Sequence, residues 1–114
     1  MILLIEERAT PEQMIEMLQT LRTYIKLAVD TQREILAGGG LLHADCEAML
    51  LEDGSEQAYI WGASWIPLTQ EATYESLINI RPRHNNRSME IGDPTIRTAV
   101  EQTVRRLLEG VRYE

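Results

Sequence analysis

The sequence predicts one α+β domain spanning residues 1–114, in which a four- or five-stranded, mainly antiparallel sheet carries two helices on one face. Three observations predict this fold. The length of 114 residues is typical of a single domain. Two segments, one near each end, combine a helix-start signal with apolar residues at helical spacing. Segments between them alternate apolar and polar residues and are separated by turn signals, so the predicted order is β-α-β-β-β-β-α.

The N-terminal segments are expected to form a strand, a helix and a second strand. Residues 2–5 are an apolar run typical of a short buried strand. Thr10 and Pro11 form a helix-start signal, since threonine caps free N–H groups and proline suits the first helical position. The apolar spacing that follows predicts a helix over residues 11–22. From Tyr24 onward the period changes to two, which predicts a strand that extends loosely toward a run of glycines.

The central segments are expected to form hairpins. The glycines at residues 38–40 read as a turn, because glycine adopts the positive φ that tight hairpins need. A strand over residues 41–52 would follow. Asp53-Gly54 is a strong hairpin signal, so the next strand would run back and end near Pro67. Residues 73–80 alternate again and predict one more strand.

The C-terminal segment predicts the second helix. Asp93 and Pro94 supply a cap and a first helical residue, and an apolar stripe at helical spacing follows them. Arg105 and Arg106 lie near the expected end, where positive charge interacts favourably with the helix dipole. Gly110 then fits a C-terminal cap. Both predicted helices are amphipathic and are expected to cover the same face of the sheet.

Composition narrows the classes of function. The formal net charge is −7, which argues against broad, nonspecific binding of nucleic acid, although it permits a local basic patch. The one cysteine excludes an intramolecular disulfide and fits a reducing compartment. The N-terminal apolar run is too short for a signal peptide or a membrane span. We therefore expect a soluble, cytoplasmic protein that does not associate with membranes.

Ionisable residues alternate in the segment that reads as a strand over residues 41–52. His43, Asp45 and Glu47 would share one face, because alternate side chains of a strand point the same way. A two-residue turn at the glycines would place Glu34 opposite Asp45. Clustered carboxylates repel one another unless a proton or a cation lies between them. This set of ligands predicts a site for Mg²⁺, Mn²⁺ or Zn²⁺.

Two alternatives explain the same residues without a metal. A three-residue turn at the glycines would place Arg33 opposite Asp45, where a salt bridge would satisfy the carboxylate. The face could also be the solvated side of an antiparallel sheet whose other side carries the helices. The spacing His-x-Asp-x-Glu is a weak motif beside a real zinc signature.

A basic loop follows the last predicted strand. Its guanidinium groups offer the paired donors that bind phosphate or carboxylate, so the loop over residues 81–88 is a candidate anion-binding site. The alternative is that its arginines pair with the excess acids of this chain. The candidate anion-binding residues are Arg81, Arg83, His84, Asn85, Asn86 and Arg87.

The remaining residues with reactive or stacking side chains are expected to be structural. Cys46 lies on the expected core face and points away from His43, so a buried, inert thiol is predicted rather than a nucleophile. Trp61 and Trp65 are four residues apart on one strand face, which favours a place in the core or at a dimer contact over stacking on a base or sugar.

Three runs of the sequence resemble a known family. They are residues 35–47 (ILAGGGLLHADCE), 61–65 (WGASW) and 75–91 (ESLINIRPRHNNRSMEI). They are similar to runs in short bacterial and archaeal hypothetical proteins, a domain of unknown function, and the resemblance covers most of residues 24–110. It implies a standalone, prokaryotic, cytoplasmic protein. It implies no activity and no catalytic residues.

Together these observations predict a small binding or interaction module that acts as a homo-oligomer, most simply a dimer, and takes a small anionic ligand at residues 81–88. An open sheet face or an exposed edge strand would supply the dimer contact. The alternative is a metal-dependent hydrolase of a phosphate ester. In that hypothesis Glu34, His43, Asp45 and Glu47 would hold the cation, and Arg81, Arg83 and Arg87 would hold the phosphate.

Overall fold

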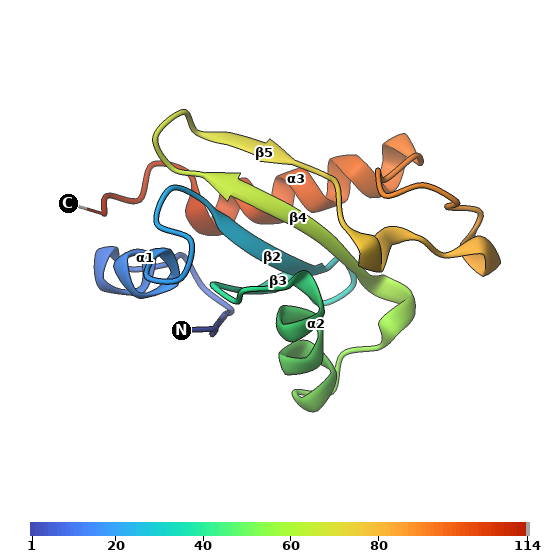
Figure 1. Cartoon of the computed structure of the whole chain (residues 1–114), viewed down its shortest axis with the longest axis horizontal. Helices are drawn as coiled ribbons and strands as arrows, with labels where there is room; N and C mark the ends of the chain where they lie inside the picture. Colours follow the sequence, from blue (N-terminus) through green and yellow to red (C-terminus); the bar gives the residue numbers. More distant parts are fainter. Residues whose placement is uncertain (114) are drawn as a thin grey trace.

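A computed structural model describes residues 1–113 and shows an α+β fold with a five-stranded antiparallel sheet and three α-helices (Figure 1). The order along the chain is β-α-β-β-α-β-β-α, with three short 3-10 helices in addition. The strands are β1 (Leu3–Ile5), β2 (Ile25–Asp30), β3 (Ile35–Gly38), β4 (Ile60–Ile66) and β5 (Glu71–Thr73). The α-helices are α1 (Pro11–Leu18), α2 (His43–Glu52) and α3 (Pro94–Leu108), and the 3-10 helices are η1 (Gln57–Tyr59), η2 (Leu77–Asn79) and η3 (Pro82–His84).

The sheet has the strand order β1-β3-β2-β4-β5, with every neighbouring pair antiparallel. Strand β2 lies at its centre and pairs along its whole length with β4, from Ile25 opposite Trp65 to Asp30 opposite Ile60. The alternation of apolar residues predicted β2 correctly. The predicted extension of this strand stops at Asp30, because the chain turns there and returns as β3.

One face of the sheet packs against α1 and α3, as predicted. The alternate residues of β2 and β4 that face these helices include both tryptophans, Trp61 and Trp65, which are 2% and 0% exposed. The tryptophans are therefore core residues. Both helices begin at the predicted caps: the Thr10 hydroxyl accepts a hydrogen bond from the Gln13 N–H, and the Asp93 carboxylate accepts one from the Thr95 N–H.

The other face of the sheet, which the sequence predicted to be open, is covered in part by α2. The residues of β2, β3 and β4 whose side chains point to this face form a second, smaller core with Cys46 and Leu50 of this helix. Cys46 and Leu50 are four residues apart and share one side of the helix. The sheet therefore lies between α1 and α3 on one face and α2 on the other.

The prediction of a strand over residues 41–52 was wrong, because this segment contains α2. Alanine, leucine, methionine and glutamate, which dominate the segment, all favour the helix over the strand. Its alternation of ionisable residues was coincidental. A helix turns about 100° per residue, so residues two apart point to different sides, whereas residues four apart lie on the same side.

The two predicted hairpin turns next to α2 are also wrong. Gly39 has φ +105° but leads from β3 into the helix rather than into a strand. Asp53 and Gly54 end the helix, with Gly54 at φ +100°, since a glycine in the left-handed region is as suitable for a helix C-terminus as for a hairpin. The real hairpin in this region joins β2 to β3, which pair from Asp30 opposite Ile35.

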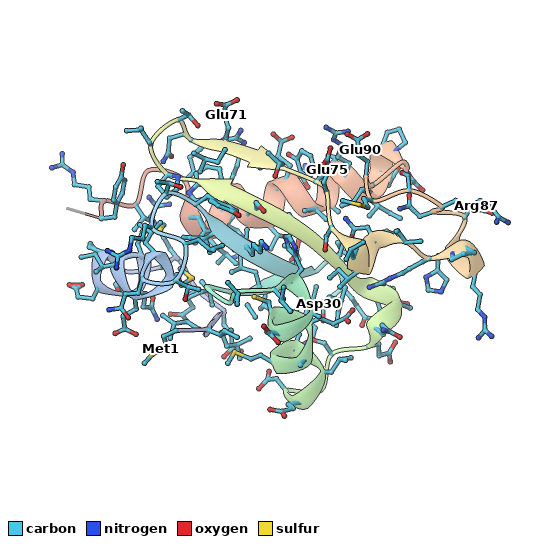
Figure 2. The ribbon with its side chains drawn as sticks, viewed as in Figure 1. Met1, Asp30, Glu71, Glu75, Arg87 and Glu90 are labelled. Atoms are coloured by element: carbon cyan, nitrogen blue, oxygen red, sulfur yellow. The ribbon has the colours of Figure 1, made fainter. Side chains whose placement is uncertain are left out.

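The prediction of a strand over residues 73–80 was wrong for most of its length. Strand β5 ends at Thr73, and the following residues pair with a later part of the chain through a bridge between Glu75 and Glu90, which lie side by side in Figure 2. Ser76 then caps η2 with its hydroxyl, which accepts from the Ile78 N–H. Within residues 1–113 no helix has both the length and the apolar character needed to cross a membrane.

Candidate functional site

The structure does not bring together the four residues predicted to hold a metal ion. Asp45 is exposed in the first turn of α2, and Glu34 is exposed in the turn between β2 and β3. His43 and Glu47 share one side of the helix but have separate partners. Among residues 1–113 no group of three or more histidine, cysteine, aspartate or glutamate side chains could hold a metal ion. The predicted cation site, and with it the predicted metal-dependent hydrolase, are not supported by this geometry.

The salt bridge considered for Arg33 has a different partner. Its guanidinium lies 2.7 Å from the carboxylate of Asp53, not beside Asp45, and 2.7 Å from the hydroxyl of Ser55. The hydrogen bond to Asp53 raises the pKa of Arg33. This contact connects the β2–β3 turn to the end of α2.

A pocket of about 520 Å³ lies where α2 faces the predicted anion-binding loop. Glu47 of α2, Gln57 of η1 and a stretch of η2 and η3 line it, and α2 also contacts η2 directly. Arg81, Arg83 and His84, three of the six predicted anion-binding residues, lie in this wall. Figure 1 shows α2 below the sheet and the segment of η2 and η3, coloured yellow to orange, beside the end of the sheet where β4 begins. Leu77, Ile78 and Ile80 form most of the apolar part of the wall.

Arg81 forms the floor of this pocket and is held by other parts of the chain. Its Nη2 lies 3.1 Å from the Glu47 carboxylate, and the two side chains are 10% and 13% exposed. Its Nη1 donates to the Gln57 carbonyl at 2.6 Å, and its Nε donates to the Ile78 carbonyl at 2.9 Å. The guanidinium also lies 5.0 Å from the centre of the Trp61 ring. Burial lowers the pKa of Arg81 while Glu47 opposes that shift, and a guanidinium remains charged throughout.

Arg83 and His84 differ from Arg81 because their side chains are exposed. Neither belongs to a salt bridge or a side-chain hydrogen bond within the described part of the chain. The alternative that the loop arginines pair with this chain's own acids therefore holds for Arg81 and not for Arg83. Two basic side chains stand at the rim of the pocket with their donors available to a ligand.

The outer residues of the loop have other roles. Asn85 is exposed and adopts the left-handed conformation with φ 58°, which lets the chain turn back after η3. Arg87 is exposed at the outer end of the loop and does not line the pocket (Figure 2). The loop closes through two backbone hydrogen bonds between Arg81 and Asn86, of 2.6 and 3.0 Å.

Asn86, which was predicted to bind an anion, is buried and holds the loop together. Its Nδ2 lies within hydrogen-bond distance of the Asn79 carbonyl at 2.7 Å, the Glu90 carbonyl at 2.8 Å and the Ser88 carbonyl at 3.0 Å. Its Oδ1 accepts from the Gly92 N–H at 2.9 Å. Both the Nδ2 and the Oδ1 of Asn86 thus have their hydrogen-bond partners within the protein, so the role of this side chain is structural.

Asn79, which is not among the candidate anion-binding residues predicted from the sequence, attaches the loop to the sheet. Its Oδ1 accepts from the Gly62 N–H at 2.7 Å, and its Nδ2 donates to the Gly62 carbonyl at 3.0 Å. The same Nδ2 lies 3.1 Å from the Met89 carbonyl and 3.3 Å from that of Tyr74. The side-chain amide of Asn79 thus forms hydrogen bonds with the backbone of β4 at Gly62, beyond the part of β4 that pairs with β5. An asparagine between two isoleucines in an apparent strand was the signal, because asparagine is depleted in strands.

His43 lies in a second pocket, of about 310 Å³, on the other side of η2. Its Nε2 lies 2.9 Å from the Ala63 carbonyl and 3.4 Å from the Ser64 hydroxyl. A carbonyl can only accept, so this nitrogen carries the proton and donates it to Ala63. It is therefore not free to take a proton from Ser64, and the pair does not form a nucleophile and its base.

We expect His43 to lower the stability of the protein at acid pH. Burial lowers its pKa below the ordinary value of 6.5, so the unfolded chain binds a proton at a higher pH than the folded one does. Its contribution is fully present above that ordinary value and is lost as the pH falls through it toward the folded pKa. The stability difference between the wild type and His43→Gln should therefore decrease from pH 8 to pH 5, as measured by urea unfolding.

An exposed residue without an ionisable group provides the control for this prediction. Leu68→Gln should follow the wild-type dependence of stability on pH, since Leu68 is exposed and the substitution changes no titratable side chain. Carboxylates that titrate over the same range contribute equally to all three proteins and cancel in the differences. Parallel curves for the wild type and His43→Gln would contradict a lowered pKa of His43 in the folded protein.

Cys46 is buried and inert, as predicted, although it lies on a helix instead of a strand. Burial raises its pKa to about 11, so at neutral pH the side chain is a thiol rather than the reactive thiolate. Its Sγ donates to the Lys26 carbonyl at 3.4 Å, which leaves it facing the sheet and away from both pockets.

Comparison with known proteins gives a family without a known function. The family described as "Protein of unknown function (DUF5674)" matches residues 3–107. No curated protein and no solved structure matches the chain. The match covers both pockets and the loop over residues 81–88, and it spans nearly all of the described residues. The chain therefore belongs to the DUF5674 family.

Proposed function

We propose that the protein is a small binding module whose ligand carries an anionic group, which is recognised by Arg83 and His84 at the rim of the larger pocket. The observation that carries this proposal is the contrast between neighbouring basic residues. The Arg81 guanidinium is held by Glu47 and by two carbonyls, whereas Arg83 and His84 line the same pocket without an acidic partner among residues 1–113.

Electrostatics supports an anionic ligand for this pocket in particular. The chain has a net charge of −7, so an anion is repelled by most of the molecule. Among residues 1–113 only Glu47 brings a carboxylate to this pocket, and its charge is already neutralised by Arg81. The Arg81–Glu47 pair therefore adds little net charge to the pocket, and Arg83 supplies positive charge that no acidic side chain among residues 1–113 compensates.

Inorganic phosphate and acetate are the first probes of this proposal. A ligand that binds only the folded state raises Tm by mass action, and 100 times the Kd contributes about 2.7 kcal/mol. We expect phosphate to raise the wild-type Tm by several degrees relative to sodium chloride of equal ionic strength. Arg83→Ala should remove at least half of this increase, because the guanidinium supplies the paired donors. Differential scanning fluorimetry measures both effects.

Arg87→Ala is the matched control. It removes the same charge from the same loop, but Arg87 does not line the pocket, so the phosphate effect should stay close to that of the wild type. An equal loss in both variants would indicate general charge attraction instead of a site. An unchanged Tm with every anion tested would contradict the proposal.

Assembly and cellular context remain predictions from the sequence. A homodimer would form most simply at β1, which has one neighbour in the sheet and therefore a free edge. Sedimentation of the wild type at several concentrations would measure the oligomeric state. A prokaryotic source and a cytoplasmic location are what the resemblance and the single cysteine favour.

A further inference from the structure

The two pockets are neighbours that share a wall. Leu77 and Ile78 of η2 line the larger pocket on one side and the pocket beside His43 on the other. The second pocket is completed by Leu42 at the start of α2 and by Met89, which follows the anion-binding loop. One short 3-10 helix thus stands between two hollows on the same side of the molecule.

Apolar side chains project from this region into solvent. Leu77 is 73% exposed, Leu42 is 54% exposed, Ile80 is 43% exposed and Met89 is 42% exposed, and we refer to these four as the apolar ridge. Single exposed leucines are common on protein surfaces, but apolar side chains grouped around two pockets are typical of an interaction site. A small ligand is bound in a concavity, whereas projecting side chains are buried by a second macromolecule.

Charge identifies the partner that would suit this ridge. The ionisable groups lining the two pockets include three cations, Lys26, Arg81 and Arg83, and two carboxylates, Glu47 and Glu75. The Glu47 carboxylate forms a salt bridge with Arg81, and His84 adds a further nitrogen donor at the rim of the larger pocket. The region therefore has a slight excess of positive charge on a chain of net charge −7. An apolar and basic surface is complementary to an apolar and acidic segment.

We propose that the ligand of this site is an extended segment of a partner protein that carries two aliphatic side chains at alternate positions and an acidic side chain at the next alternate position. This inference rests on the proposed function, because Arg83 and His84 would bind the acidic side chain. In an extended chain successive side chains point in opposite directions and alternate ones point the same way. Such a segment therefore turns these three side chains toward the protein, with one aliphatic side chain in each pocket, on either side of Leu77, and the carboxylate over the basic rim.

Fluorescence anisotropy with labelled synthetic peptides tests the inference on the full chain. The probe is a pentapeptide of sequence leucine-serine-leucine-serine-aspartate, the leucine–aspartate peptide. It is compared with a lysine peptide, in which lysine replaces the aspartate, and with a serine–aspartate peptide, in which serine replaces both leucines. We expect the leucine–aspartate peptide to bind at least 10-fold more tightly than either of the others. Leu77→Ser should weaken its binding by about 10-fold, as expected for a central apolar contact of an interface.

Leu68→Ser is the matched control, because Leu68 is 81% exposed and lines neither pocket. It should leave peptide binding unchanged. Leu42→Ser, which changes the second pocket alone, should weaken peptide binding and leave the effect of phosphate on Tm unchanged, whereas Arg83→Ala should reduce both the phosphate effect and peptide binding. Thermal unfolding of each variant without ligand confirms that it is folded.

Several results would overturn the inference, and they separate it from the proposed function. If phosphate raises Tm but the leucine–aspartate peptide binds no better than the serine–aspartate peptide, the anion site stands and the peptide site fails. If neither phosphate nor any peptide binds, both fail. Equal binding of the lysine peptide contradicts the charge argument. Leu77-dependent binding to phosphatidylglycerol vesicles, or Leu77-dependent self-association in sedimentation, without peptide binding would assign the ridge to a lipid surface or to a second copy.

Discussion

Replacing Gly62 by alanine is expected to lower the stability of the protein by about 3 kcal/mol or more, which corresponds to a decrease in Tm on the order of 10 °C. A Cβ at this position would lie 2.4 Å from the Cβ of Ser76, 2.7 Å from its Oγ and 3.0 Å from a side-chain carbon of Ile78. The Cβ of Ser76 cannot rotate away, so the backbone of one of the two segments has to shift. Urea unfolding of the purified variant measures the loss.

The close contact at Gly62 can be tested by a second substitution and a control. Ser76→Gly removes the clashing atoms, so in the Gly62→Ala background it should restore part of the lost stability although it is destabilising alone. Gly54→Ala is the control, because a Cβ there meets nothing within 4 Å and the cost is only the strain of φ +100°. That strain is worth about 1–2 kcal/mol. Equal losses for the two alanine variants would contradict the close approach of Ser76 to β4.

Replacing Asn79 by alanine is the second substitution with a large expected effect, a loss of about 3 kcal/mol. The buried N–H of Gly62 would lose its acceptor, and the carbonyls of Gly62, Tyr74 and Met89 would lose a donor. Each buried polar group left without a partner costs about 1–3 kcal/mol, partly recovered where water enters. The anion effect on Tm should decrease in the same variant, since Asn79 holds the segment that forms the pocket wall.

Asn79→Asp sharpens this test because it keeps the size and shape of the side chain. The aspartate can still accept from the Gly62 N–H, but it places a carboxylate against three carbonyl oxygens that need a donor. We expect it to be at least as destabilising as alanine at pH 8. Asn85→Gly is the control within the same loop, because Asn85 is exposed and glycine readily adopts its left-handed backbone. A loss below 1 kcal/mol for Asn79→Ala would contradict the structural role of its amide.

The elements predicted correctly are those whose signals are local. The caps at Thr10 and Asp93 act within three residues, so α1 and α3 could be predicted from short stretches of sequence. Strand β2 shows a clear alternation because one of its faces contacts the larger core. In α2 only Cys46 and Leu50 are fully buried, so the helical spacing is faint, and a chance alternation of ionisable residues was read as a strand.

The sequence singled out several residues of the candidate site, some by a sound pattern and one from a wrong strand. Composition alone was enough to single out Arg81, Arg83 and His84, because basic residues grouped in a turn-rich segment are typical of an anion site. Glu47 was singled out as a metal ligand from a wrong strand and is the partner of Arg81 instead. The contact between them joins residues 34 positions apart, and no local pattern encodes such a pairing.

The sequence also could not predict which residues of the loop are buried and structural and which are exposed. Asn86 and Asn85 are neighbours of the same type, yet one is buried and bonded to four backbone groups while the other is exposed. Their burial differs because the chain turns at Asn85, which has φ 58°, and because the loop meets the edge of the sheet. Hydrogen bonds between a side chain and a distant backbone group produce no periodic pattern in the sequence.

A titration with phosphate followed by ¹H–¹⁵N NMR would show whether an anion binds between α2 and the segment Leu77–His84. We expect saturable shifts of the backbone amides of residues 77–84 and of Glu47, and their loss in Arg83→Ala but not in Arg87→Ala. Shifts confined to the exposed amides at the start of α3, or spread evenly over the chain without saturation, would contradict binding at this site.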